Sequence, residues 1–211
     1  MVGTFVVVDG PDGAGKTTLV KRLASRLRIA GHEVLEVRQP GGTPVAEAAR
    51  AAALDADMHA SPLAELFLML AARADQVEKV IRPALERGQV VLSDRYDLST
   101  EAYQIAGRGL PRDRVMGANE LATDGVRPDL TIVLDLPAEV GLKRQARDGK
   151  EPDRIEREGL EWHERVAEVF LQASGSGVVH VDATESVDAV ERAAWSAVER
   201  HLAETSDGGQ G

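Results

Sequence analysis

Cysteine is absent from this sequence of 211 residues, and only 3% of its residues are aromatic. Without cysteine the chain forms no disulfide and no thiolate metal site, and it fits a reducing compartment such as the cytoplasm. Hydrophobic residues make up 43% of the sequence, so there is enough apolar material for a core, and that core must be mainly aliphatic. The length suits one α/β domain.

Positive charge is also scarce, because 25 lysines and arginines face 35 aspartates and glutamates, for a formal net charge of −10. This balance argues against general binding to nucleic acids or to anionic membranes, so an anionic ligand must be attracted by a local cluster of arginines. Apolar runs of transmembrane length and a basic-then-apolar signal segment are missing as well. We therefore expect a cytoplasmic protein with neither a nucleic-acid nor a membrane partner.

The clearest motif lies near the N-terminus, where residues 10–17 fit G-x-x-x-x-G-K-[ST], the phosphate-binding loop. Its glycines let backbone N–H groups close on phosphate oxygens, Lys16 is a point charge for the β- and γ-phosphates, and Thr17 offers a hydroxyl to Mg²⁺. An apolar strand precedes the motif and an amphipathic helix, ended by Gly31, follows it. The sequence therefore predicts that the protein binds a nucleoside triphosphate.

Five apolar runs read as strands, and helical segments separate them; the runs are residues 4–9, 33–38, 90–93, 130–135 and 178–181. Because they are rich in Val, Ile and Leu with little alternation, we expect parallel strands that are buried on both faces of one sheet. The longest helix should run from about residue 62 to 87. We expect a single domain over residues 1–203 and a disordered polar tail over residues 204–211.

Two strands end in an acid that could hold Mg²⁺ and its waters beside the phosphate loop. We prefer Asp94, because Arg95 follows it and adds a cation that could clamp a transferring phosphate. Asp135 is the alternative, although it leads directly into Pro137 and resembles the entry to a helix.

Three further segments allow both a structural and a functional interpretation. The turn-rich loop over residues 38–44 is either a connector with a helix cap at Thr43 or a ligand loop at the end of a parallel strand. On helical spacing alone, Arg73 is most simply a solvated charge. The charged segment over residues 142–154, which contains Gly149 and Pro152, is either a solvated face or a lid that closes over polyphosphate.

Taken together, these segments resemble the bacterial thymidylate kinases, a family of P-loop nucleoside monophosphate kinases. The resemblance is carried by residues 9–18, by the Arg-Gln-Pro-Gly-Gly-Thr loop over residues 38–43, by the Asp-Arg-Tyr segment at 94–96 with the helix after it, and by residues 127–144 and 153–166. It spans nearly the whole chain in family order. It implies a three-layer fold with a five-stranded parallel sheet of order 2-3-1-4-5, a short lid over about residues 143–154, and a homodimer.

The resemblance also implies transfer of a phosphoryl group from ATP to dTMP, with Mg²⁺ as the metal ion, and it suggests a role for each site residue. The catalytic residues it implies are Lys16, Asp94, Arg95, Arg147 and Arg154, and the metal ligands are Thr17 and Asp94. The residues implied to bind the ATP phosphates are Gly10, Gly13, Ala14, Gly15, Lys16, Thr17, Thr18 and Arg144. Those implied to bind the acceptor nucleotide are Asp12, Arg38, Arg50, Met69, Arg73, Ser99, Tyr103 and Gln104.

The sequence departs from the family pattern at three points. Met69 occupies the position where the family usually has a phenylalanine that stacks on thymine, and a thioether covers a ring with less area. Gln39 replaces the usual glutamate of the loop, and the spacing from Arg144 to Arg154 is about one residue longer. A kinase for another or a 5-modified pyrimidine is therefore the alternative interpretation, and a non-catalytic nucleotide-binding switch is a remote one, because no guanine-binding Asn-Lys-x-Asp motif is present.

Overall fold

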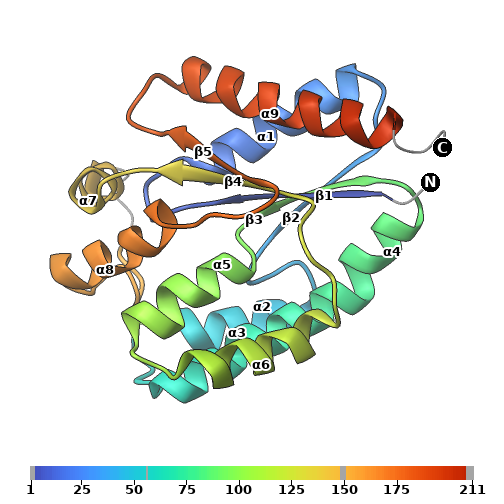
Figure 1. Cartoon of the computed structure of the whole chain (residues 1–211). Coiled ribbons are helices and arrows are strands. Elements are labelled where there is room, and N and C mark those ends of the chain that lie inside the picture. The colour runs from blue at the N-terminus through green and yellow to red at the C-terminus, as the bar shows by residue number, and fades with distance from the viewer. Residues whose placement is uncertain (1–2, 56, 148–150, 208–211) are drawn as a thin grey trace.

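The computed structural model describes residues 3–55, 57–147 and 151–207, and these form a parallel five-stranded sheet between two layers of helices (Figure 1). The strands are β1 (Thr4–Asp9), β2 (Val34–Arg38), β3 (Val90–Asp94), β4 (Leu130–Asp135) and β5 (Val178–Asp182). Their order in the sheet is β2-β3-β1-β4-β5, which confirms the predicted order. Each strand begins and ends within one residue of its predicted bounds.

The central strand β1 is buried on both faces of the sheet, which explains the apolar run at residues 4–9. Phe5 and Val7 point to one face of the sheet and Val6 and Val8 to the other, and none of the four is more than 1% exposed. On the face of Val6 and Val8 lie α1 (Lys16–Ile29) and α9 (Val187–Asp207). The opposite face carries the remaining long helices, so a β1 side chain meets protein on either side.

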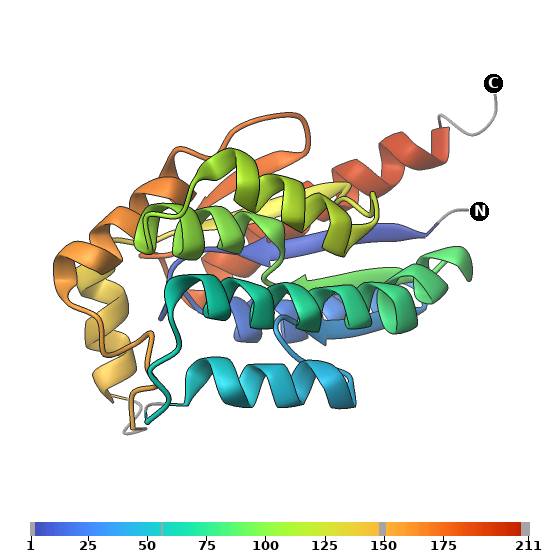
Figure 2. The same ribbon diagram turned by 90° about the horizontal axis from the view of Figure 1, so that it is seen from below.

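Several helices cover that opposite face. It contains α3 (Pro62–Gln76), which continues through the π-helical turn η1 (Val77–Ile81) into α4 (Arg82–Glu86), and α5 (Asp97–Thr100), which continues into the π-helical η2 (Glu101–Gly107). The helices α2 (Pro44–Leu54) and α6 (Arg112–Thr123) lie on either side of α3 in Figure 2. The helices α7 (Ala138–Arg147) and α8 (Leu160–Leu171) stand at the carboxyl edge of the sheet.

The long helix predicted over residues 62–87 is present, but it contains a π-helical turn that the pattern did not predict. Pro83 has no backbone N–H, so it leaves the carbonyl one turn earlier without its helical donor, and the widened turn of η1 directly precedes it. The helix cap expected at Thr43 is confirmed, because the Thr43 hydroxyl accepts a hydrogen bond from the Ala46 N–H at 3.1 Å.

The segment expected to be a tail from residue 204 begins about one helical turn too early. Helix α9 continues to Asp207, and the Thr205 hydroxyl donates to the carbonyls of His201 and Leu202. The polar composition of this stretch therefore fits an exposed helix rather than a frayed end. The rest of the predicted tail, residues 208–211, lies outside the described residues. Within the described part of the chain, no helix is both long enough and apolar enough to cross a membrane.

Candidate functional site

The phosphate-binding loop joins the carboxyl end of β1 to α1, so its backbone N–H groups lie at the positive end of that helix. Gly13 has φ +75°, and a Cβ there would lie 2.4 Å from the carbonyl oxygen of Gly141 in α7. Gly15, the residue before α1, has φ +91°. Only glycine takes these conformations at little cost, and at Gly13 only glycine allows α7 to approach the loop so closely.

Lys16 folds back over this loop. Its Nζ donates to the carbonyl oxygens of Gly10 at 3.0 Å and Pro11 at 2.7 Å. The side chain is buried, and burial together with the nearby Arg95 guanidinium lowers the pKa of Lys16 to about 8. A cation that the fold solvates this poorly is well placed to interact strongly with an anion.

Thr17 and Asp94 meet at the edge of the loop. The Thr17 hydroxyl donates to the Asp94 carboxylate at 2.5 Å, because parallel pairing places Asp94 opposite Val8, the penultimate residue of β1. Two hard oxygen ligands with room for water and phosphate match the preference of Mg²⁺. The alternative acid, Asp135, instead contacts Nδ1 of His180 on the neighbouring strand at 2.8 Å. The geometry therefore favours Asp94 over Asp135.

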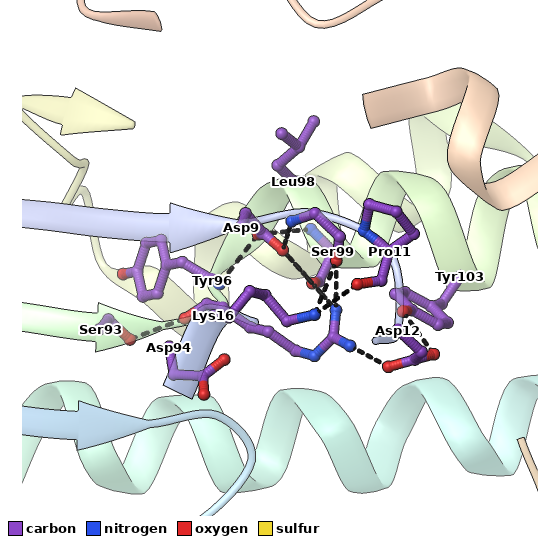
Figure 3. A network of polar contacts seen from close by, with 12 residues as sticks. Asp9, Pro11, Asp12, Lys16, Ser93, Asp94, Tyr96, Leu98, Ser99 and Tyr103 are labelled. Carbon is purple, nitrogen blue, oxygen red and sulfur yellow. Dashed lines mark hydrogen bonds and ion pairs between the residues drawn. The ribbon is translucent and has the colours of Figure 1, made fainter. Parts of the chain in front are cut away.

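Asp9, which no sequence assignment included, organises the floor of the site (Figure 3). It has no exposed surface, and it accepts hydrogen bonds from the Ser99 hydroxyl at 2.7 Å and from the backbone N–H groups of Gly10, Tyr96 and Ser99. Burial raises the pKa of Asp9. Like Asp94, it is an acid that ends a central strand, and that position was the signal that could have identified it.

Arg95 links this floor to the phosphate loop. Its guanidinium donates to the Gly10 carbonyl at 3.1 Å and to the Ser99 hydroxyl at 3.2 Å, and it forms an ion pair with Asp12. Arg95 has φ +73°, a left-handed conformation that is strained for a side chain of this size. Burial is the largest influence and would raise the pKa of Asp12, but the charges of Arg95 and Lys16 and the hydrogen bond from Tyr103 together outweigh it, so the net shift is downward.

A cavity of about 170 Å³ opens beside this network. Its walls contain all of the residues assigned to the acceptor nucleotide except Arg38; these are Asp12, Arg50, Met69, Arg73, Ser99, Tyr103 and Gln104. Asp12 lines the cavity from the phosphate-binding loop. Its carboxylate accepts a hydrogen bond from the Tyr103 hydroxyl at 2.8 Å (Figure 3). The cavity therefore has one wall in common with the phosphate-binding loop.

Arg73 is a buried donor hub rather than the solvated charge that its spacing alone suggested. Only 5% exposed, it donates from Nε to Gln39 at 2.8 Å, from Nη1 to Thr100 and Asn119, and from Nη2 to the Tyr96 carbonyl at 2.8 Å. These partners are neutral, and burial lowers the pKa of Arg73. One Nη2 N–H has no partner among the described residues, and Arg73 lines the cavity.

The two other arginines assigned to the acceptor lie in different places. Arg50 lines the cavity, half-buried, and donates to the Pro40 carbonyl at 3.2 Å; burial lowers its pKa. Arg38 is exposed and forms an ion pair with Glu47 at 2.9 Å. Arg38 borders a second groove, which contains Thr17 and Asp94, so the structure places it near the predicted metal ligands and outside the acceptor cavity.

The three arginines assigned to the lid also lie in different surroundings. Arg144 reaches the phosphate loop, where Nη1 donates to the Gly13 carbonyl at 3.3 Å. Arg147 is exposed at the end of α7. Arg154 points elsewhere, because it forms an ion pair with Glu65 and donates to the Ala53 carbonyl at 3.0 Å. Residues 148–150 of the predicted lid lie outside the described residues.

Comparison with known proteins identifies the family to which the chain belongs. The family model described as thymidylate kinase matches residues 8–194. The chain is 46% identical over 199 residues to the thymidylate kinase of Deinococcus radiodurans, covering 93% of this chain and 96% of that protein. It is 47% identical over 202 residues to that of Geobacter sulfurreducens (91% and 94%) and 45% identical over 196 residues to that of Pseudomonas putida (91% and 93%). The chain therefore belongs to the thymidylate kinase family.

Proposed function

We propose that the protein transfers the γ-phosphoryl group of ATP to the 5′-phosphate of dTMP, which gives dTDP and ADP, with Mg²⁺ as the metal ion. One observation carries this proposal: Asp12 belongs to the phosphate-binding loop and also lines the acceptor cavity. A phosphate held by the loop therefore lies next to the occupant of the cavity. The names of the relatives support dTMP as that occupant.

Transfer between two phosphates requires in-line positioning and charge neutralisation, and no nucleophile from the protein. The loop N–H groups and Lys16 would hold the β- and γ-phosphates of ATP. At the loop end of the cavity, Arg50 and Arg95 would hold the acceptor phosphate, and Asp12, already bonded to Arg95 and Tyr103, would accept from the sugar 3′-hydroxyl. The two phosphates thus approach each other between cations that the fold holds in place.

Thr17 and Asp94 would hold Mg²⁺, since their oxygens already converge at 2.5 Å and the pair leaves room for phosphate and water. When bound, this ion neutralises charge on the ATP phosphates. The same pair lines the groove that Arg38 borders. We include Arg38 in the proposal as a residue that supports this groove through its pairing with Glu47.

For the lid, we propose Arg144 and Arg147 as the cations nearest to the transferring group. Arg144 already contacts the loop, and Arg147 is exposed and follows it along α7. A catalytic role for Arg154 requires that it first leave Glu65 and the Ala53 carbonyl. We retain Arg154 in the proposal as a residue that changes partners when the lid closes, and we place the enzyme in the cytoplasm, which the absence of cysteine suits.

The test is a coupled ADP-release assay with ATP and Mg²⁺ over a panel of acceptors that contains dTMP, dUMP, 5-substituted dUMPs, dCMP, UMP and dGMP. We expect the highest kcat/KM with dTMP. A higher value with a 5-modified pyrimidine would keep the reaction type and overturn the acceptor. ATP turnover without any acceptor preference would overturn the proposal as a whole.

We further propose a homodimer that packs through α2, α3 and α6. These helices form the outer surface in Figure 2, and they expose large apolar side chains: Leu63 is 51% exposed, Phe67 56% and Leu121 84%. Large apolar side chains that stay exposed on neighbouring helices are typical of a protein interface. Light scattering after size-exclusion chromatography should give twice the chain mass, and Phe67→Asp should shift the mass toward that of the monomer. A monomeric wild-type protein at micromolar concentration would refute the dimer.

A further inference from the structure

Glu65 is an enclosed carboxylate in α3 that none of the roles above explains. It has no exposed surface, and its two oxygens contact three side chains from other parts of the chain. Arg108 donates from Nε to Oε2 at 3.0 Å, Arg154 forms an ion pair with the same oxygen, and Gln104 donates from Nε2 to Oε1 at 2.8 Å. The two arginines compensate the buried charge. The bond to Gln104 does something more.

A carboxylate paired with arginines can only accept hydrogen bonds, so the side-chain amide of Gln104 must turn its NH₂ group toward Glu65. Its oxygen then faces the other way. No described residue donates a hydrogen bond to that oxygen. The oxygen is also not one of the fully buried polar atoms that lack a partner in the described part of the chain, so it keeps some accessible surface. Because Gln104 lines the acceptor cavity, its oxygen is an acceptor that opens into the cavity.

We propose that Glu65 is a positioning residue that fixes the Gln104 amide with its oxygen toward the cavity, and so selects bases that present an N–H group there. The inference deepens the proposed function and rests on it. It gives Glu65 a role in the choice of substrate, although Glu65 itself touches no substrate.

Arg73 completes the selection from the same cavity. Its one unused Nη2 N–H is a donor, and Gln104 supplies an acceptor, so the wall offers one of each. Thymine and uracil carry a carbonyl at position 4 and an N–H at position 3, which is the matching acceptor and donor. Cytosine carries an amino group and a bare ring nitrogen, so the same wall would leave buried groups unpaired against it.

Glu65→Gln tests the inference. Residue 65 would then have one oxygen for the two arginines, and its new NH₂ group would turn toward Gln104. The Gln104 amide would have to turn over and present NH₂ to the cavity. We expect the ratio of kcat/KM for dTMP to that for dCMP to fall about ten-fold or more, the scale of one mismatched hydrogen bond. The loss should be mainly a rise in KM for dTMP, since the base lies away from the transferring phosphate.

Glu158→Gln is the matched control. Glu158 shares Arg108 with Glu65 through an ion pair, but it neither bonds to Gln104 nor lines the cavity. This variant should keep the wild-type ratio. A purely structural Glu65 would lower kcat/KM for dTMP and dCMP equally and would leave the ratio unchanged in both variants.

Should Glu65→Gln not fold, the same substitution combined with Arg154→Gln removes the arginine charge that would otherwise lose its partner. Any change in kcat cancels in the ratio, and Arg154→Gln alone provides the baseline. A wild-type ratio in the double variant, or an equal fall in Glu158→Gln, would overturn the role of Glu65. A wild-type enzyme that prefers dCMP would instead overturn the proposed function, and the inference with it.

Discussion

Arg73→Lys should weaken both the fold and the reading of the base. Arg73 donates four hydrogen bonds, from Nε and from both terminal nitrogens, to acceptors on three separate segments: Gln39, the stretch from Tyr96 to Thr100, and Asn119. A lysine donates from a single atom and cannot reproduce this planar fork. At least one of the four acceptors therefore loses its donor inside the protein.

The magnitude follows from that count. A buried acceptor without a donor costs about 1–3 kcal/mol, and each kcal/mol lowers Tm by about 2–4 °C in a chain of this size. We therefore expect Tm to fall by about 2–12 °C in differential scanning calorimetry. The matched control is Arg127→Lys, because Arg127 pairs with Glu120 on the surface and both side chains are more than half exposed. An exposed pair contributes little, so this control should keep its Tm within about 2 °C.

The same variant also loses the second Nη2 N–H, the proposed donor to the base. We therefore expect kcat/KM for dTMP to fall about 10²-fold, more than kcat/KM for a nucleotide whose base does not accept this hydrogen bond. A lower Tm with unchanged kcat/KM for dTMP would show that Arg73 is structural only and that the base is read elsewhere. An unchanged Tm would refute the donor count itself.

Three further substitutions address other parts of the molecule. Lys16→Ala should lower kcat by at least about 10²-fold without loss of Tm, because the depressed pKa shows that the fold disfavours the Lys16 charge; near-normal turnover would refute its role. Met69→Phe should tighten dTMP binding about 2- to 10-fold in calorimetry if residue 69 covers the base, and equal affinity would place it outside the pocket. His180→Gln concerns stability against pH: burial opposes the charge, but Asp135 and the Ala173 carbonyl outweigh it and raise the His180 pKa, so its stabilisation is complete below about pH 6.5 and is lost as pH rises through the folded-state pKa. Urea unfolding should therefore show a gap from wild type at about pH 5.5 that closes by about pH 8.5, and a gap that widens with pH would contradict this sign.

The fold followed from the sequence because its determinants are local. Each strand is an apolar run, the phosphate loop has a strict spacing, and Thr43 is a helix cap that reads directly from the chain. The apolar composition of the strands and their alternation with helical segments predicted a parallel sheet, and the family resemblance supplied the strand order. What failed was a boundary and a helix type: the end of α9 depends on weak helical preferences, and η1 depends on how the helix accommodates Pro83.

The acceptor side of the site was less accessible to sequence reasoning, because its polar residues lie in phase with apolar ones. Along α3 and the start of η1, one inward stripe consists of Leu66, Leu70, Arg73 and Val77, and the next consists of Glu65, Met69, Ala72 and Gln76. A polar residue on such a stripe is either buried and paired or exposed, and periodicity does not distinguish the two. The partners of Glu65 and Arg73 come from distant segments, so only the folded chain reveals them.

Gln39 shows the same limit and also why its departure from the family pattern is tolerated. Its side-chain oxygen accepts from Arg73, and its NH₂ group donates to the Gln76 oxygen at 2.9 Å. Gln76 in turn donates to the backbone carbonyls of Arg38 and Gly41. In this series of hydrogen-bonded side-chain amides, each NH₂ group donates and each oxygen accepts. A glutamate at position 39 would pair with Arg73 but would set a carboxylate against the Gln76 oxygen, so residues 39 and 76 act as one unit. The neutral residue in the loop is therefore matched to a glutamine on another element, and Arg73 keeps its position without a bonded carboxylate.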